Sequence, residues 1–146
     1  MSKRFTVAEA QSLVPRLEGS MRAAVALKSE FDQADSAVRA VLDRVNMMGG
    51  MIIDRDRVKE ARQRRDDVAQ RLKTAIEEVQ DLGCLVKDLE MGLVDFPTLF
   101  RDVEVYLCWK LGESRIAYWH RTEEGFRGRK PIDAEFLRHH RGDLPQ

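Results

Sequence analysis

Cysteine is scarce in this chain, and the little that is present carries no strong motif. Cys84 and Cys108 are the two cysteines among 146 residues, and they lack the CxxC spacing of a metal-binding or redox pair. Two cysteines are too few for the disulfide scaffold of a small secreted protein, so we expect both to remain thiols in a reducing compartment. No apolar run approaches the roughly 20 residues that span a bilayer, and the opening segment MSKRFTVAEA lacks the apolar core of a signal peptide. These absences predict a cytoplasmic protein that does not contact a membrane.

The chain also lacks an excess of charge of either sign. Its 25 Lys and Arg residues balance its 25 Asp and Glu residues, so no global field draws it to a polyanion and nucleic-acid binding is not expected. Strong catalytic motifs are missing as well, including glycine-rich nucleotide loops, a serine elbow and HExxH. A length of 146 residues suits one domain with a modest core, or one core with an extended arm.

The first half of the chain has the periodicity of a long helix. Thr6 and Glu9 have the spacing of a capping box, which predicts a helix that begins near Val7. Small and apolar residues then recur in alternating steps of three and four. Pro15 lies inside this pattern, where it removes an amide donor and crowds the preceding turn, so we predict a kink or a short break near Val14.

A second helix of the same pattern follows a glycine turn. Gly49–Gly50 and then Asp54 predict a turn and a new helix cap, and the apolar seam resumes over residues 58–82. Two helices with one seam form an antiparallel hairpin. The first helix is the longer, so its N-terminal turns overhang the second and are expected to pack on the C-terminal region. A patchy second apolar stripe favours self-association, most simply as a dimer; its members are Met21, Val25 and Leu42.

From Gly83 onward the pattern changes from helical to extended. We predict strands near residues 84–87, 92–96, 103–110 and 114–120, with Pro97 ending the second strand and Gly112–Glu113 turning the last hairpin. A loop and a short helix from about Ala134 complete the chain. The predicted fold is therefore α+β: a long antiparallel helical hairpin over residues 1–82, followed by a small antiparallel sheet of three or four strands over residues 83–146, in one folding unit.

The predicted register of the last hairpin assigns its side chains to two faces. If Leu111 pairs with Ser114, alternation places His120 at the edge of an apolar face and Trp119 on the opposite face with Cys108. This register separates Cys108 from His120, so we expect an inert thiol rather than a nucleophile. The same register predicts that Trp109 and Tyr118 belong to the core beneath the helices.

The segments LVDFP, LCWKLGE, YWH and GFRGRKPI follow a helical hairpin that opens with FTVAEAQSLVP. In this order they resemble a prokaryotic domain-of-unknown-function family, the one numbered twenty-two oh three. The resemblance spans nearly the whole chain and implies a helical hairpin before a short, strongly patterned C-terminal part. It implies no activity, substrate or cofactor, because the family has none assigned, and no residue role is transferred from it. The polar members of the signature are Asp88, Glu90, Asp95, Glu113, His120 and Arg129.

Four of these polar residues are candidate metal ligands: Asp95, His120, Glu90 and Glu113. Carboxylates with one imidazole form a ligand set that suits iron, manganese or zinc. Glu113 and His120 would lie about 20 Å apart on a straight strand, so they converge only if the strand bends or a second chain contributes one of them. A smaller site of Asp95, His120 and Glu90 stays open, because adjacent strands lie about 5 Å apart. The structural alternative is that His120 bonds a carboxylate and closes the sheet edge.

Trp119, Arg127 and Arg129 are the candidate surface for a ligand or partner. We expect Trp119 to be exposed, where its ring can stack on a flat ligand. The GFRGR segment places Arg127 and Arg129 in a glycine frame whose guanidinium groups suit a carboxylate or a phosphate. An ion pair between Arg129 and Asp95 or Glu90 is the structural alternative.

Three functions fit these patterns. The favoured one is a non-enzymatic, oligomeric interaction or ligand-binding module whose partner is an unidentified protein or small molecule. The second is a metal-binding protein or metal-dependent enzyme centred on Asp95 and His120. The third rests on architecture alone: a hairpin with acidic residues near its tip is analogous to coiled-coil factors that enter the secondary channel of RNA polymerase. Those acidic residues are Asp43, Asp54 and Asp56.

Overall fold

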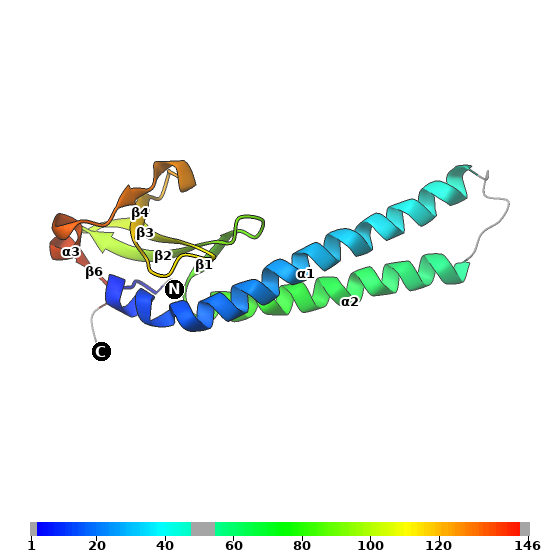
Figure 1. Ribbon diagram of the computed structural model, residues 1–146, viewed down its shortest axis with the longest axis horizontal. Coiled ribbons are helices and arrows are strands. Elements are labelled where there is room, and N and C mark those ends of the chain that lie inside the picture. Colours follow the sequence, from blue (N-terminus) through cyan, green and yellow to red (C-terminus); the bar gives the residue numbers. More distant parts are fainter. Residues whose placement is uncertain (1–2, 48–54, 144–146) are drawn as a thin grey trace.

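The computed structural model describes residues 3–47 and 55–143 of the chain. It has the predicted α+β organisation, in which a long helical hairpin precedes a small antiparallel sheet (Figure 1). The elements in chain order are α1 (Val7–Met47), α2 (Arg55–Gln80), β1 (Leu85–Asp88), β2 (Leu93–Phe100), β3 (Val103–Lys110), β4 (Tyr118–Arg121), the 3-10 turn η1 (Phe126–Gly128), β5 (Lys130–Pro131), α3 (Ala134–His139) and β6 (His140–Arg141).

Helix α1 begins where the capping box predicts. The Thr6 amide donates to the Glu9 carboxylate at 3.0 Å, and the Glu9 amide donates to the Thr6 hydroxyl at 3.1 Å, so two amides of the first turn are satisfied. Of the kink or short break predicted near Val14, the break is absent, because α1 continues through Pro15. Burial of Val14 and Leu17 holds this turn against the sheet despite the missing amide donor. Figure 1 shows the helix changing direction in this N-terminal part.

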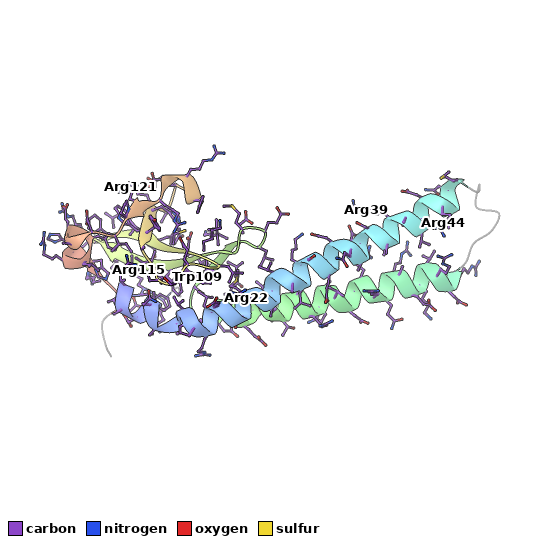
Figure 2. All side chains as sticks on the ribbon, viewed as in Figure 1. Arg22, Arg39, Arg44, Trp109, Arg115 and Arg121 are labelled. Carbon is purple, nitrogen blue, oxygen red and sulfur yellow. The ribbon has the colours of Figure 1, made fainter. Side chains whose placement is uncertain are left out.

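The N-terminal turns of α1 cover one face of the sheet, as their overhang predicts. Ala10, Leu17 and Met21 belong to the same buried cluster as Phe96 and Trp109 of the sheet. Figure 2 shows Trp109 between the sheet and α1. Beyond this core the two helices continue as a projecting arm, whose buried seam consists of Ala34, Val38, Val68 and Ala75.

The described residues near the tip of the helical arm do not favour any one of the three predicted functions. Asp54 and the glycine turn lie outside the described residues, so the analogy with polymerase-binding factors stays a prediction. The self-association of the chain also stays a prediction. No helix in the described part of the chain combines the length and apolarity that crossing a membrane requires.

The sheet has the strand order β1-β2-β3-β4-β5, with β6 pairing to β2. The prediction that Pro97 ends the second strand is wrong, because β2 runs through it and Pro97 lies opposite Tyr106 of β3. On this side of β2, strand β1 pairs only as far as Asp95 and β6 pairs only with Leu99 and Phe100, so no strand lies beside Pro97. There the Pro97 carbonyl accepts from the Phe5 amide at 2.7 Å. The missing amide of proline therefore costs no ladder hydrogen bond.

The predicted register of the last hairpin is wrong by one residue. Strand β4 contains only Tyr118–Arg121, and Trp119 rather than Tyr118 lies opposite Leu107. The chain turns tightly after β3, where the Glu113 amide donates to the Lys110 carbonyl at 2.9 Å and the Glu113 carboxylate accepts from the Lys110 amide at 2.7 Å. Farther along this loop, residues 114–117 form no strand. A shift of one residue exchanges the two faces of a strand.

The shift moves three side chains relative to expectation. Trp119 is only 7% exposed and packs against Phe100 and Phe136, so the prediction of an exposed ring is wrong. Tyr118 points outward instead of into the core. His120 turns away from the helices and joins the face that carries Cys108, which assembles the site described next.

Candidate metal-binding site

Three neighbouring strands place one polar side chain each on the sheet face that points away from α1. Asp95 of β2 lies directly opposite Cys108 of β3, and His120 of β4 lies opposite Tyr106, two residues before Cys108. Asp95, Cys108 and His120 are 2%, 1% and 3% exposed. One potential ligand atom from each of these residues lies within 4.8 Å of the other two. We call this group the Asp–Cys–His cluster.

His120 is held by hydrogen bonds at both ring nitrogens. Its Nδ1 lies 2.7 Å from the Arg121 carbonyl, which can only accept, so Nδ1 carries a hydrogen. Its Nε2 lies 3.1 Å from each carboxylate oxygen of Asp95, which favours a hydrogen there as well when no cation is bound. Burial by itself lowers the pKa of His120, but the hydrogen bonds to Asp95 and the Arg121 carbonyl, with the charge of Asp95, raise that pKa above its ordinary value. These contacts thus favour the protonated imidazole in the metal-free protein.

Cys108 completes the cluster as a protonated thiol. Burial, and then the negative charge of Asp95, raise the pKa of its thiol to about 12, although Arg129 acts in the opposite direction. A thiol with such a pKa is a poor nucleophile, which agrees with the expected lack of reactivity. The reason differs from the expected one, because Cys108 and His120 share a face instead of lying on opposite faces. A bound metal ion would change this state, since a coordinating thiol loses its proton.

The cluster lies at the base of a pocket of about 300 Å³. The loop between β1 and β2 and the segment that leads from β4 into η1 form its rim. Its walls combine apolar and charged side chains, among them Tyr106, Phe126, Met91, Lys87 and Glu124. The three candidate ligands are therefore buried in the sheet yet face a space that a small molecule can enter.

The spacing of His120 and Asp95 suits a zinc ion, and the Cys108 Sγ lies within 4.8 Å of both. Two donors at about 2.0–2.1 Å from zinc and at a tetrahedral angle lie roughly 3.3 Å apart, close to the Nε2–carboxylate separation of 3.1 Å. The bond from Nδ1 of His120 to the Arg121 carbonyl is the outer-shell contact that fixes Nε2 as the coordinating atom. One thiolate, one imidazole and one carboxylate form a typical zinc ligand set, and three protein ligands leave a fourth position for water or another ligand.

A family model described as "Uncharacterized conserved protein (DUF2203)" matches residues 3–132. The chain belongs to the DUF2203 family. Comparisons with curated proteins and with solved structures found no match. The DUF2203 match contains every strand that carries the Asp–Cys–His cluster, whereas α3 and β6 lie beyond it.

Of the four metal ligands predicted for this DUF2203 chain, the structure brings Asp95 and His120 together. Glu90 is exposed in the turn after β1, where its amide donates to Asp88. Glu113 is also outside the cluster, because both of its carboxylate oxygens accept from Arg129, at 2.9 and 2.7 Å. The sequence analysis missed Cys108 as the third member, since the wrong register placed it on the other face.

Arg129 is a buried residue rather than a free surface cation. Its side chain is only 9% exposed, and its guanidinium lies 4.0 Å from the Tyr118 ring centroid and 4.8 Å from that of Phe126. The predicted ion pair with Asp95 or Glu90 is replaced by the pair with Glu113. Arg127, on η1, is the exposed arginine of the GFRGR segment.

Proposed function

We propose that this protein binds one zinc ion through Asp95, Cys108 and His120. The observation that carries the proposal is the convergence of three different donor groups, each almost fully buried, within 4.8 Å at the base of a pocket. Buried ionisable groups are expensive to desolvate, and a cation at their centre compensates the carboxylate and the thiolate together. The protein is on this proposal a metal-binding module.

The donor set selects among the metals that carboxylates and imidazole alone would accept. Manganese favours sites built from oxygen ligands, whereas a thiolate suits zinc and other thiophilic ions. The sequence predicted iron, manganese or zinc, and the thiol of Cys108 makes zinc the favoured ion of the three. The register of three paired strands places Cys108, Asp95 and His120 together, so the three donors are in position before a metal ion binds.

A structural hydrogen-bond network is the competing explanation, and it accounts for the contacts of the cluster but not for its position. The His120–Asp95 pair satisfies both ring nitrogens of His120 without a metal. A hydrogen bond from the Cys108 thiol to the same carboxylate extends this network. The network leaves unexplained why all three groups face a pocket instead of apolar side chains. Zinc binding accounts for the convergence of the three groups and for their position.

The test is elemental analysis of protein purified without a chelator or a histidine tag. The expected result is close to one zinc per chain, with loss of zinc in Cys108→Ser and in His120→Ala. Cys84→Ser is the matched control, because Cys84 is an equally buried thiol whose Sγ bonds the Val79 carbonyl, away from the cluster. Circular dichroism of each variant shows whether the fold survives.

Two results would overturn the proposal. One is folded wild-type protein that contains no metal and takes up no zinc when zinc chloride is added at micromolar concentration. The other is zinc content that stays the same in folded Cys108→Ser and His120→Ala, since the ion would then be held elsewhere. Glu90→Gln adds a further control, because Glu90 is exposed outside the cluster and its replacement is expected to leave zinc content unchanged.

A further inference from the structure

The pocket above the cluster offers no fourth protein ligand among the described residues. Glu124 is one further carboxylate on the pocket wall, but its Oε1 accepts from the Arg121 amide at 2.9 Å and from Lys130 Nζ at 2.7 Å. Asp88 also lines the pocket, and its Oδ1 accepts from the amides of Glu90 and Met91. Both carboxylates are thus committed to the loops that carry them.

Glu124 is also fixed in place by the packing of its own loop. A Cβ atom added to Gly128 would lie 2.8 Å from the Glu124 Cβ and 2.9 Å from its Oε2. Only glycine permits this close approach, so the loop is closed tightly around the Glu124 side chain. A swing of Glu124 towards the cluster would break this packing and the Lys130 ion pair together.

The position of the cluster in the fold argues against a purely structural ion. Structural zinc sites are closed by four protein ligands and supply much of the folding energy of their domain. Here the apolar core lies on the opposite face of the same strands, where Val94, Leu107 and Trp109 are buried against α1. The sheet is held by that core and by its ladders, so the ion is not needed to form it.

One cation at the pocket has no carboxylate partner within the part of the chain that the structure describes. Lys87 lines the pocket from β1, and its Nζ lies 4.9 Å from the Tyr106 ring centroid. Of the other basic groups nearby, Lys130 pairs with Glu124 and Arg129 pairs with Glu113. Lys110 does not line the pocket, and its Nζ lies 5.6 Å from the Phe126 ring centroid. Zinc with the Asp95 carboxylate and the Cys108 thiolate carries no net charge. The Asp88 carboxylate also lines the pocket, but its Oδ1 is held by two backbone amides, so Lys87 is the group on the wall that offers a positive charge to an anion.

We propose that the fourth coordination position of the zinc ion faces this pocket and binds the carboxylate of a small organic acid, with the Lys87 ammonium facing the same group. This inference rests on the proposed zinc site. A pocket of about 300 Å³ is at the small end of the range for ligand sites, which limits the acid to a compact molecule. The Tyr106 and Phe126 rings supply apolar walls for its body.

The experiment replaces zinc by Co²⁺, whose visible absorption bands respond to coordination number and geometry. Each protein is first saturated with Co²⁺ and then titrated with benzoate as the probe. We expect a saturable change in the position and intensity of the bands. We also expect Lys87→Met to weaken benzoate binding by about 3- to 10-fold, the effect of removing one partly screened charge.

Lys3→Met is the matched control, because Lys3 Nζ also lies 4.9 Å from an aromatic centroid, that of Phe5, but away from the pocket. Its benzoate affinity is expected to equal that of the wild type. Bands that do not respond to benzoate in Co²⁺-loaded protein would overturn the open position, and a response with no dependence on Lys87 would overturn the role proposed for its ammonium. Failure to bind either Co²⁺ or zinc would instead overturn the proposed function itself.

Discussion

His120 and Asp95 meet through one imidazole nitrogen and both carboxylate oxygens, since Nε2 lies 3.1 Å from Oδ1 and from Oδ2. The other ring nitrogen is anchored on the Arg121 carbonyl, so the ring cannot turn away without losing a hydrogen bond. The two residues are 3% and 2% exposed, so little of either side chain contacts water. The His120–Asp95 pair is a buried hydrogen-bonded pair in the metal-free protein, and on the zinc proposal its two members become ligands of the ion.

Replacing Asp95 removes the only side-chain acceptor that His120 has among the residues that the structure describes. In metal-free protein we expect Asp95→Ala to lower the free energy of unfolding by about 1 to 3 kcal/mol, because the buried imidazole loses its partner. The measurement is urea denaturation in the presence of a chelator. Asp32→Ala is the control: Asp32 forms an exposed ion pair with Lys28, and its loss is expected to cost no more than about 0.5 kcal/mol. Equal effects of the two changes would contradict the burial of Asp95.

The raised pKa of His120 predicts how the stability of metal-free protein depends on pH. A pKa that is higher in the folded than in the unfolded protein means that folding favours protonation. The resulting stabilisation is complete below the unfolded pKa of about 6.5 and is lost as the pH rises through the folded value. Unfolding of chelated wild type and His120→Gln at several values between about pH 6 and 9 isolates this contribution. We expect the difference in the free energy of unfolding between the two proteins to shrink as the pH rises. A difference that stays constant would contradict a raised pKa of His120 in the folded protein.

The helices and the order of the strands were predictable because short-range signals encode them. The Thr6–Glu9 capping box fixes the start of α1, and Gly83 adopts a φ of +99° at the end of the second helix, a conformation that favours glycine. Pro97 misled the prediction, because the sequence does not show that β1 stops pairing at Asp95 and leaves the proline without a neighbour on that side. Short-range sequence signals therefore predicted the helices and strands, but not the residue at which each of them ends.

The candidate site was only partly predictable, because its register depends on contacts from distant parts of the chain. Gln11 of α1 accepts from the Ile116 amide at 2.8 Å, and the Trp109 indole donates to the Glu113 carbonyl at 2.9 Å. These bonds hold the loop before β4 open and set which face His120 occupies. Asp95 and His120 were identified from residue type alone, whereas Cys108 required the register.

Arg129 holds the loop beside the pocket through stacking and an ion pair at once. We expect Arg129→Met to lower the free energy of unfolding by about 1 to 3 kcal/mol, since Glu113 is left without its partner in a partly buried setting. Arg129→Lys is expected to restore little, because an ammonium lacks the planar group that lies over the Tyr118 ring. Arg127→Met is the control at an exposed neighbour, and thermal unfolding of the three variants makes the comparison. Full recovery with lysine would show that charge alone matters.

The start of α1 is capped by a histidine from the far end of the chain. The Val7 amide donates to His140 Nε2 at 3.0 Å, and the His140 Nδ1 hydrogen is donated to the Leu137 carbonyl at 2.9 Å. Loss of a side-chain cap costs about 1 kcal/mol, so we expect His140→Ala to lower the free energy of unfolding by that amount. The neighbouring His139→Ala is the control, because His139 is exposed. Urea denaturation at neutral pH distinguishes the two, and equal stability of both variants would show that the cap contributes nothing.

Zinc should stabilise the folded chain even though the sheet forms without it. A ligand that binds only the folded state adds a free energy that grows with its concentration, about 2.7 kcal/mol at 100 times the dissociation constant. We expect thermal unfolding of chelator-treated protein to shift upward when zinc chloride is added, and the shift to disappear in Cys108→Ser. The same variant is expected to unfold close to wild type in chelator, because Cys108 is protonated there and only the metal requires its thiolate. A zinc-induced shift of equal size in Cys108→Ser would place the ion outside the cluster, since serine is a much weaker zinc ligand than a thiolate.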